Sequence, residues 1–353
     1  MDEQHHHKAP NHSRPLLYVP NTLWTRLFAA TVITETVLTV AIERLRAYGD
    51  ISWILMSLWD DLDDDKKADG PMRLQSFLGL YIFALLYELA LSYDALRRKN
   101  TIQLVGVCIC NLGLLAYGIL QIQEIKDTVS SLTGENLSDH LEDLYHIEII
   151  LVPVFLGIGT VCMSVFTWKL RAEFSWSIYK NISADLQMKR RYFTYQVYIA
   201  LLKFDFFFVF GSQLQILLVV FQAADLDFIL NAALIPLTIG TLVLSAQFCK
   251  REKTKSLILM MFFMLIIIGC FGLTLHRIHA PTESADFSSV RVSLTLFAAL
   301  SLLLMVLTLV NSVMCILNFN KGLKIHVNPP KKRKTSVSLE LESQETPSRF
   351  LLN

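Results

Sequence analysis

Four ionisable residues fall inside long apolar runs of this sequence: Glu35, Glu88, Lys203 and Asp205. At the centre of a bilayer a charged side chain costs roughly 2.5–3.5 kcal/mol, so such residues are rare and often mark a proton, ion or substrate pathway. The three carboxyl groups are therefore candidates for binding protons or cations. Pairing between neighbouring helices is the alternative interpretation of the same residues.

Lys203 and Asp205 are two positions apart, so on a helix they project from different faces and cannot neutralise each other. Each therefore requires a partner on another helix. We expect Glu35 or Glu88 to lie opposite Lys203. Lys203 is also close enough to one end of its apolar run to extend its ammonium group toward the interface.

The sequence predicts no enzyme active site. Tyr93-Asp94 matches one half of the membrane aspartyl protease signature, but the Gly-x-Gly-Asp half does not occur. The sequence also contains no nucleotide-binding loop and no serine nucleophile motif. His276 and His279 have a spacing that suits one face of a helix, and His140 and His146 lie in another loop on the same predicted side, but interfacial polar side chains explain them better than metal ligands do. We predict no catalytic residues, no metal site and no cofactor.

Composition places the chain in a membrane. Of its residues 53% are hydrophobic and only 18% are charged, with a mean hydropathy of +0.44. A helix needs about 20 apolar residues to cross a hydrocarbon core of roughly 30 Å. The sequence predicts an all-α polytopic bundle of eight transmembrane helices, with spans at 24–43, 74–93, 102–122, 147–168, 195–222, 226–248, 256–276 and 290–318. The first span is the weakest because it is short and contains Glu35, and without it seven spans remain.

The basic residues predict the orientation of this bundle. With eight spans, 23 of the 32 Lys and Arg residues fall on the side that holds both termini, and 8 fall on the other. The positive-inside rule then places residues 1–23, a polar segment, and residues 319–353, a disordered basic tail, in the cytosol. The helical bundle occupies residues 24–318. Pro153 and Pro236 lie within spans, where proline can break a helix.

Two matching sequons fall on opposite sides of this topology. Asn136-Leu137-Ser138 lies in a loop predicted to be lumenal, which makes Asn136 the candidate for N-glycosylation. Asn181-Ile182-Ser183 has the same pattern on the cytosolic side and is expected to stay unmodified. The pair provides an internal control on the orientation.

Two basic segments predict contact with membrane lipids. Residues 169–191 mix basic and aromatic side chains, as in a short amphipathic helix that lies on anionic headgroups, although a plain basic connector has the same composition. Residues 331–334, Lys-Lys-Arg-Lys, are a second candidate for anionic headgroups. Ser336 is a phosphorylation candidate that would release the tail from the lipid surface. We expect no nucleic-acid partner, and protein partners stay unknown.

One stretch carries a family resemblance. Tyr195–Gly211, with the sequence YQVYIALLKFDFFFVFG, resembles an uncharacterised fungal family of multi-pass Golgi apparatus membrane proteins. Ser183–Tyr192 is similar to the same family, as is Tyr18-Val19-Pro20. The resemblance implies a location in the Golgi membrane and brings no catalytic residues.

Together these features predict an integral multi-pass Golgi membrane protein with a non-enzymatic organising or trafficking role, exerted through its cytosolic loop and tail. The first alternative is a proton- or cation-coupled transporter or channel that uses Glu35, Glu88 and Asp205. The second is a seven-span receptor-like protein, which requires that the first apolar segment does not cross the membrane.

Overall fold

The computed structural model describes residues 20–58, 64–133, 135–182, 186–220, 226–278 and 291–322. Within these ranges the chain forms eight α-helices and no strand. The helices are α1 Leu23–Leu58, α2 Asp64–Arg98, α3 Thr101–Thr133, α4 Glu135–Ile182, α5 Leu186–Val220, α6 Leu226–Lys250, α7 Thr254–Ile278 and α8 Arg291–Leu317. Each contains a stretch long and apolar enough to cross a membrane, including Leu23–Leu45 in α1. The all-α membrane fold is confirmed, and it has eight candidate spans in the described ranges rather than seven.

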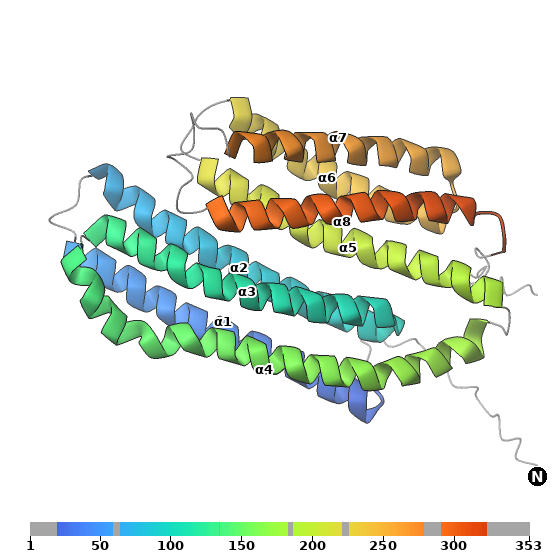
Figure 1. Ribbon diagram of the computed structural model, residues 1–353, viewed down its shortest axis with the longest axis horizontal. Helices are drawn as coiled ribbons and strands as arrows, with labels where there is room; N and C mark the ends of the chain where they lie inside the picture. Colours follow the sequence, from blue (N-terminus) through green and yellow to red (C-terminus); the bar gives the residue numbers. More distant parts are fainter. Residues whose placement is uncertain are drawn as a thin grey trace, which may run out of the picture.

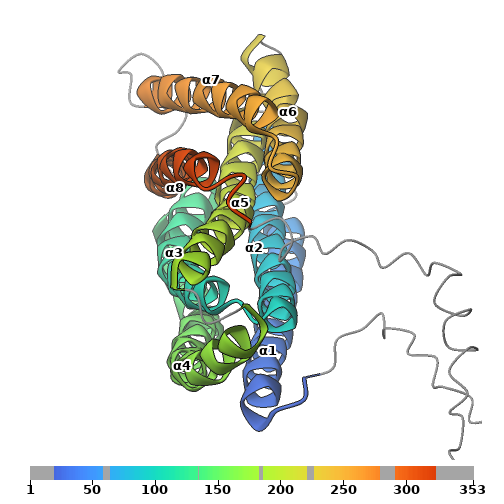
Figure 2. The same cartoon turned by 90° about the vertical axis from the view of Figure 1, so that its right-hand side faces the viewer.

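The helices pack as two four-helix halves that lie side by side (Figure 1). In the N-terminal half, α1 to α4 surround a core that includes Phe28, Tyr81 and Leu156. In the C-terminal half, α5 to α8 surround a second core that includes Tyr198 and Met264. The end view in Figure 2 shows that α5 and α8 lie between the rest of their own half and the helices of the N-terminal half.

Helix α5 is the centre of the molecule. It packs against α6 and α8 within its own half and against α2 and α3 across the seam between the halves. Of the residues in its span, 61% are buried, against 22–44% in the other seven spans. This helix contains Tyr195–Gly211, so the most distinctive stretch of the sequence forms the most buried span.

The seam between α2 and α5 is aromatic. Tyr87 stacks on Phe206 and on Phe207, with ring centroids 5.4 Å apart in both pairs. The Tyr87 hydroxyl also donates a hydrogen bond to the main-chain carbonyl of Lys203 at 2.9 Å. Large rings with one satisfied polar group fix the two helices in register, because aromatic pairs prefer particular geometries. This register places Lys203 opposite the last turns of α2.

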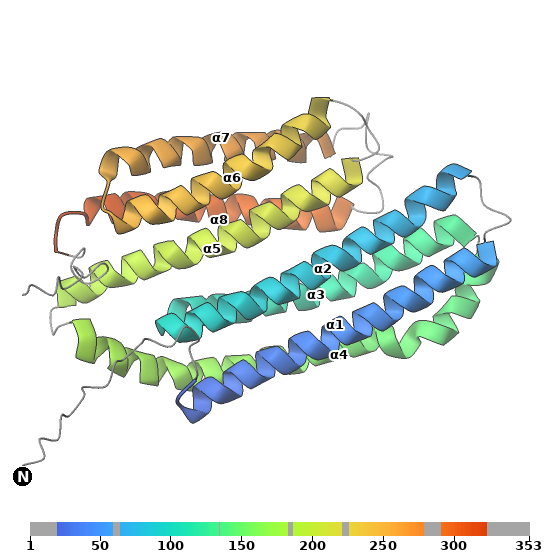
Figure 3. The same cartoon turned by 180° about the vertical axis from the view of Figure 1, so that it is seen from behind.

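Five features meet at one end of the bundle: the start of α1, the α2–α3 turn, the α4–α5 connection, the α6–α7 turn and the end of α8 (Figure 3). The Arg191 guanidinium donates to the main-chain carbonyl of Lys321 at 2.9 Å. The Asn320 amide donates to the Glu252 carboxylate at 3.2 Å. We call this the basic end, because its described Lys and Arg residues include Arg26, Arg97, Arg98, Lys99, Lys189, Arg190, Arg191, Lys250, Arg251, Lys253, Lys255 and Lys321.

The tight α2–α3 turn at the basic end has a clear local cause. Lys99 takes a left-handed conformation, with φ of 52°, and the Asn100 amide bonds back to the carbonyl of Ala95 at 3.0 Å. The Asn100 side chain then caps α3 by accepting from the amides of Ile102 and Gln103 at 3.1 and 3.4 Å. The turn holds the end of α2 and the start of α3 next to each other.

Two of the alternatives that the sequence left open are not found in the described residues. Pro153 and Pro236 do not break their helices, because α4 and α6 run continuously through them. Residues 169–191 do not form a separate amphipathic helix, because α4 continues to Ile182 and α5 begins at Leu186. The side chains of Asn136 and Asn181, together with 1–19, Ser336 and 331–334, lie outside the described part of the structure.

Candidate carboxylate site in the membrane core

Glu35 lies inside the N-terminal half and is held by two other helices. The Asn111 side-chain amide on α3 donates a hydrogen bond to Glu35 Oε1 at 2.8 Å. The backbone of α4 approaches from the other side, where a Cβ atom added to Gly159 would overlap the Glu35 carboxyl group. Glu35 is only 7% exposed and Asn111 is fully buried. Glycine at 159 is therefore what leaves room for the carboxyl group.

Glu88 on α2 lies close enough to Glu35 for the two charges to repel each other. It is 5% exposed, and its Oε1 atom has no hydrogen-bond partner among the described residues. Within the same described ranges, the Oδ1 atom of Asn111 and the hydroxyl of Tyr81 are also buried without a hydrogen bond. We call Glu35, Glu88 and Asn111 the carboxylate site.

The carboxylate site lies near the middle of the membrane-crossing stretches. Glu35 is twelve residues from the start of its span at Leu23, Glu88 is ten from the end of its span at Arg98, and Asn111 is ten from Thr101. At about 1.5 Å per residue these separations are roughly 15–18 Å, which is about half of a 30 Å hydrocarbon core. The two carboxyl groups thus lie near the middle of the membrane.

Other polar and titratable groups face the site from several helices. Tyr81 on α2 is within electrostatic reach of Glu43 on α1, of Tyr117 on α3 and of both carboxyl groups of the site. Cys108 and Cys110 on α3 are within reach of Glu88. Among the described residues, no Lys or Arg forms an ion pair with Glu35 or Glu88. Such a cluster of acids favours the uptake of a proton or a small cation, because adjacent buried carboxylates cannot both stay charged at low cost.

Asp205 is a separate buried acid in the C-terminal half. It is fully buried, and the Thr308 hydroxyl on α8 donates to its Oδ2 atom at 2.5 Å. Its Oδ1 atom has no hydrogen-bond partner in the part of the chain that the structure describes. The structure therefore does not bring Asp205 together with Glu35 and Glu88, and the three predicted acids form two sites, one in each half.

Lys203 has a different partner from the one expected. Its ammonium group forms an ion pair with Asp94 on α2 and donates to Gln103 Oε1 on α3 at 2.7 Å. The expectation that Glu35 or Glu88 lies opposite Lys203 is wrong, because Lys203 lies at the level of the last turns of α2. The expectation that Lys203 and Asp205 face different helices is correct, since one contacts α2 and α3 and the other contacts α8.

Sequence reasoning missed Asp94 and Gln103. Asp94 was placed just beyond a span that was expected to end at residue 93, whereas the apolar stretch of α2 runs to Arg98. One feature of the sequence could have pointed to Asp94: it is an acidic residue one turn before the basic run Arg97-Arg98-Lys99. Gln103 is uncharged, but it is fully buried and its side-chain amide also donates to the carbonyl of Leu91 at 2.9 Å.

The described residues contain no group of three or more His, Cys, Asp and Glu side chains arranged to hold a metal ion. His276 is exposed at the end of α7. His279 and the side chains of His140 and His146 lie outside the described residues.

Comparison with other proteins gives one informative match. The chain is 30% identical over 280 residues to a UPF0658 Golgi apparatus membrane protein of Schizosaccharomyces pombe, and the alignment covers 73% of this chain and 79% of that protein. No family model matches the chain. No solved structure matches it either.

Proposed function

We propose that this chain, which belongs to the UPF0658 family of Golgi apparatus membrane proteins, is a non-enzymatic proton- or cation-coupled transporter or channel that works through its buried carboxylates. The protein is a multi-pass protein of the Golgi apparatus membrane, with eight candidate membrane-spanning helices in the described residues. The proposal concerns what those helices do there.

The observation that carries the proposal is the presence of two buried carboxyl groups, Glu35 and Glu88, near mid-membrane in the same half of the bundle. A purely structural role would be served more cheaply by apolar side chains, because replacing buried charged or polar groups by well-packed apolar ones is often neutral or stabilising. The site instead combines two carboxyl groups, a buried amide with an unused oxygen, and a glycine that makes room for them. Binding and release of a proton or cation would use each of these features.

The experiment uses the full-length protein in sealed vesicles that contain a pH-sensitive dye. A membrane potential, or an opposing gradient of K⁺, Na⁺, Mn²⁺ or Ca²⁺, is then imposed. We expect proton movement with the wild type under at least one of these gradients, and its loss in Glu88→Gln. Arg98→Gln, which changes an exposed charge outside the site, should behave as the wild type. Proton movement that is absent in the wild type under every gradient, or unchanged in Glu88→Gln, would contradict the proposal.

A second candidate is an organising or trafficking role, and the basic end favours it. Arg191 and Asn320 tie the start of α5, the α6–α7 turn and the end of α8 into one surface, from which the basic tail continues. Such a surface suits acidic lipid headgroups or acidic protein segments. Under this role, deletion of 323–353 should mislocalise the protein or its clients while Glu88→Gln leaves both in place. The deletion should begin after Gly322, because Phe319 is buried and Asn320 makes a hydrogen bond.

A further inference from the structure

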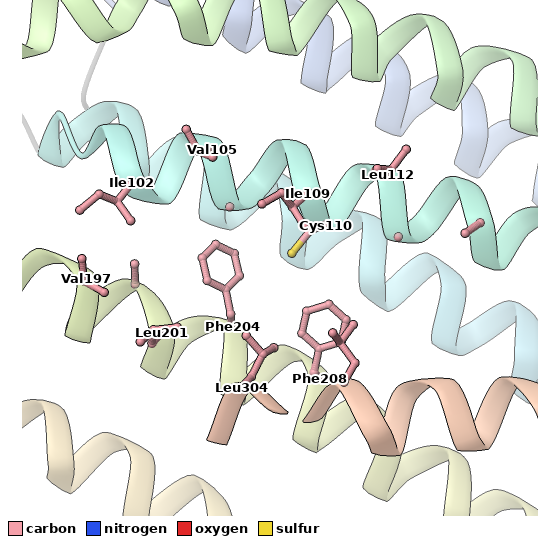
Figure 4. A pocket seen from close by; sticks show the side chains of 15 residues that line it. Ile102, Val105, Ile109, Cys110, Leu112, Val197, Leu201, Phe204, Phe208 and Leu304 are labelled. Carbon is pink, nitrogen blue, oxygen red and sulfur yellow. The ribbon is translucent and has the colours of Figure 1, made fainter. Parts of the chain in front are cut away.

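A lateral groove of about 530 Å³ lies at the seam between the two halves. Its walls come from α3 of the N-terminal half and from α5 and α8 of the C-terminal half (Figure 4). Phe204 and Phe208 of α5 form its floor opposite α3, and Leu304 of α8 lies beside them. This volume is within the usual range for small-molecule sites, roughly 300–1,000 Å³. The groove lies outside the carboxylate site.

Small residues create the groove. Gly106, Gly113 and Ala116 on α3 line it together with Ala200 on α5. At Gly106 the Phe204 ring packs directly on the backbone, so that an added Cβ would overlap the ring. At Gly113, seven residues further along the same face, an added Cβ would meet no atom within 4 Å. The helices are thus in contact at one level and separated at the next.

The groove opens toward lipid. Val105, Ile109 and Leu112 on its α3 rim are 46%, 64% and 54% exposed, and all three lie within the span Thr101–Leu120. The residues that line the groove carry no polar side chain other than the thiol of Cys110. Water is a poor occupant, because a buried water needs two to four polar partners. An alkyl chain suits such walls, and an empty space would forfeit dispersion contacts.

Charge lies at one end of the groove. Ile102 and Val197 mark the end nearest the basic end of the molecule. Lys99 is three residues before Ile102, and Arg190 lies seven residues before Val197, on the same face of α5 by helical spacing. Both basic residues are exposed. A ligand that combines an alkyl chain with an anionic group matches this order of apolar groove and basic end.

We propose that this groove binds one acyl chain of an anionic phospholipid, whose headgroup lies against Lys99 and Arg190. The positive-inside rule places the basic end at the cytosolic leaflet, where anionic lipids are concentrated. The bound lipid would contact α3, α5 and α8 together and so join the two halves. This site is independent of the proposed transport through Glu88.

The first test is native mass spectrometry of the full-length protein with added phosphatidylserine or phosphatidylcholine. The wild type should retain phosphatidylserine in preference to phosphatidylcholine. Gly113→Leu should fill the groove and lose this bound lipid. Gly269→Leu is the matched control, because Gly269 lies on an exposed face of α7 and its Cβ also meets no atom within 4 Å. Arg190→Gln should weaken phosphatidylserine binding about fivefold and leave phosphatidylcholine unchanged.

Equal retention of the two lipids by the wild type would overturn the anionic assignment, and full retention of phosphatidylserine by Gly113→Leu would overturn the site. A second measurement covers the case in which Gly113→Leu does not fold. Wild-type protein is irradiated with phosphatidylserine that carries a photoreactive group in its acyl chain. Labelling within residues 102–116, 197–208 or 300–304 supports the proposal, and labelling confined to other segments contradicts it.

Discussion

Lys203 of α5 and Asp94 of α2 form an ion pair across the seam between the two halves of the molecule. Their side chains are 21% and 28% exposed, so the pair is largely removed from water. Gln103 of α3 accepts a second hydrogen bond from Lys203 and donates one to Asp94 at 3.2 Å. Three helices from both halves are thereby joined by one network of charge-assisted hydrogen bonds, which are stronger than neutral ones.

Loss of one partner of this pair should destabilise the fold. Lys203→Met leaves the Asp94 carboxylate with only Arg98 and Gln103, and we expect a loss of about 1–3 kcal/mol in the free energy of unfolding. The double variant Lys203→Met, Asp94→Leu should lose less free energy of unfolding than the sum of the losses in the two single variants. Thermal unfolding of detergent-solubilised protein, followed by intrinsic fluorescence, measures both effects.

Arg98→Met is the control for this pair. Arg98 also contacts Asp94, with Nε–Oδ1 at 2.8 Å, but it is 47% exposed and lies on the same helix. Exposed pairs of this kind contribute about 0.5 kcal/mol or less. If Arg98→Met lowers the free energy of unfolding as much as Lys203→Met does, the ion pair across the seam contributes no more stability than the exposed pair within α2.

The contact between α3 and α5 depends on glycine at 106. Gly106→Ala should lower the free energy of unfolding by about 1–3 kcal/mol, because the new methyl group would overlap the Phe204 ring. Gly113→Ala on the same helix should change stability by less than about 0.5 kcal/mol, because its Cβ would meet open space. The same unfolding assay compares the two variants. Phe204→Leu should partly rescue Gly106→Ala, and equal effects at the two glycines would contradict the observed packing.

The hydrogen bond between Asn111 and Glu35 can be tested by a double substitution. Asn111→Leu removes the described donor to Glu35 Oε1 and should cost about 1–3 kcal/mol. Adding Glu35→Leu should recover much of that stability, because both partners are then apolar. No recovery in the double variant would indicate that Asn111 stabilises the fold through contacts other than Glu35.

The two sequons test the orientation, since Asn136 and Asn181 lie near opposite ends of one helix, α4. Only one of them can then face the lumen. We expect a glycosidase-sensitive mobility shift in the wild type that is lost in Asn136→Gln and kept in Asn181→Gln. The reverse result would place the basic end in the lumen, against the charge distribution.

The sequence predicted the fold class well, because apolar runs of about 20 residues have few other interpretations. It also identified Glu35, Glu88, Lys203 and Asp205, because charges inside such runs are conspicuous. Asn111 is detectable in the same way, because it is a polar residue inside an apolar run. These predictions depend only on local composition.

The sequence could not predict which helices meet. Lys203 pairs with Asp94 because α5 crosses the last turns of α2, and that choice depends on the packing of Tyr87 between Phe206 and Phe207. Gly159 gives no signal in the sequence, since its role depends on the approach of α4 to Glu35. Side-chain periodicity gives the faces of a helix but not the neighbour of each face.

The central claim is that the carboxyl groups of Glu35 and Glu88 gain and lose a proton inside the membrane. Infrared difference spectroscopy of the reconstituted protein, between about pH 5 and pH 8, detects the carbonyl stretch of a protonated carboxyl group. We predict that the wild type shows this band and that it is lost or shifted in Glu35→Gln and in Glu88→Gln, while Asp94→Asn retains it. A wild-type difference spectrum without a carboxyl band, or with one that neither Glu35→Gln nor Glu88→Gln changes, would contradict the account.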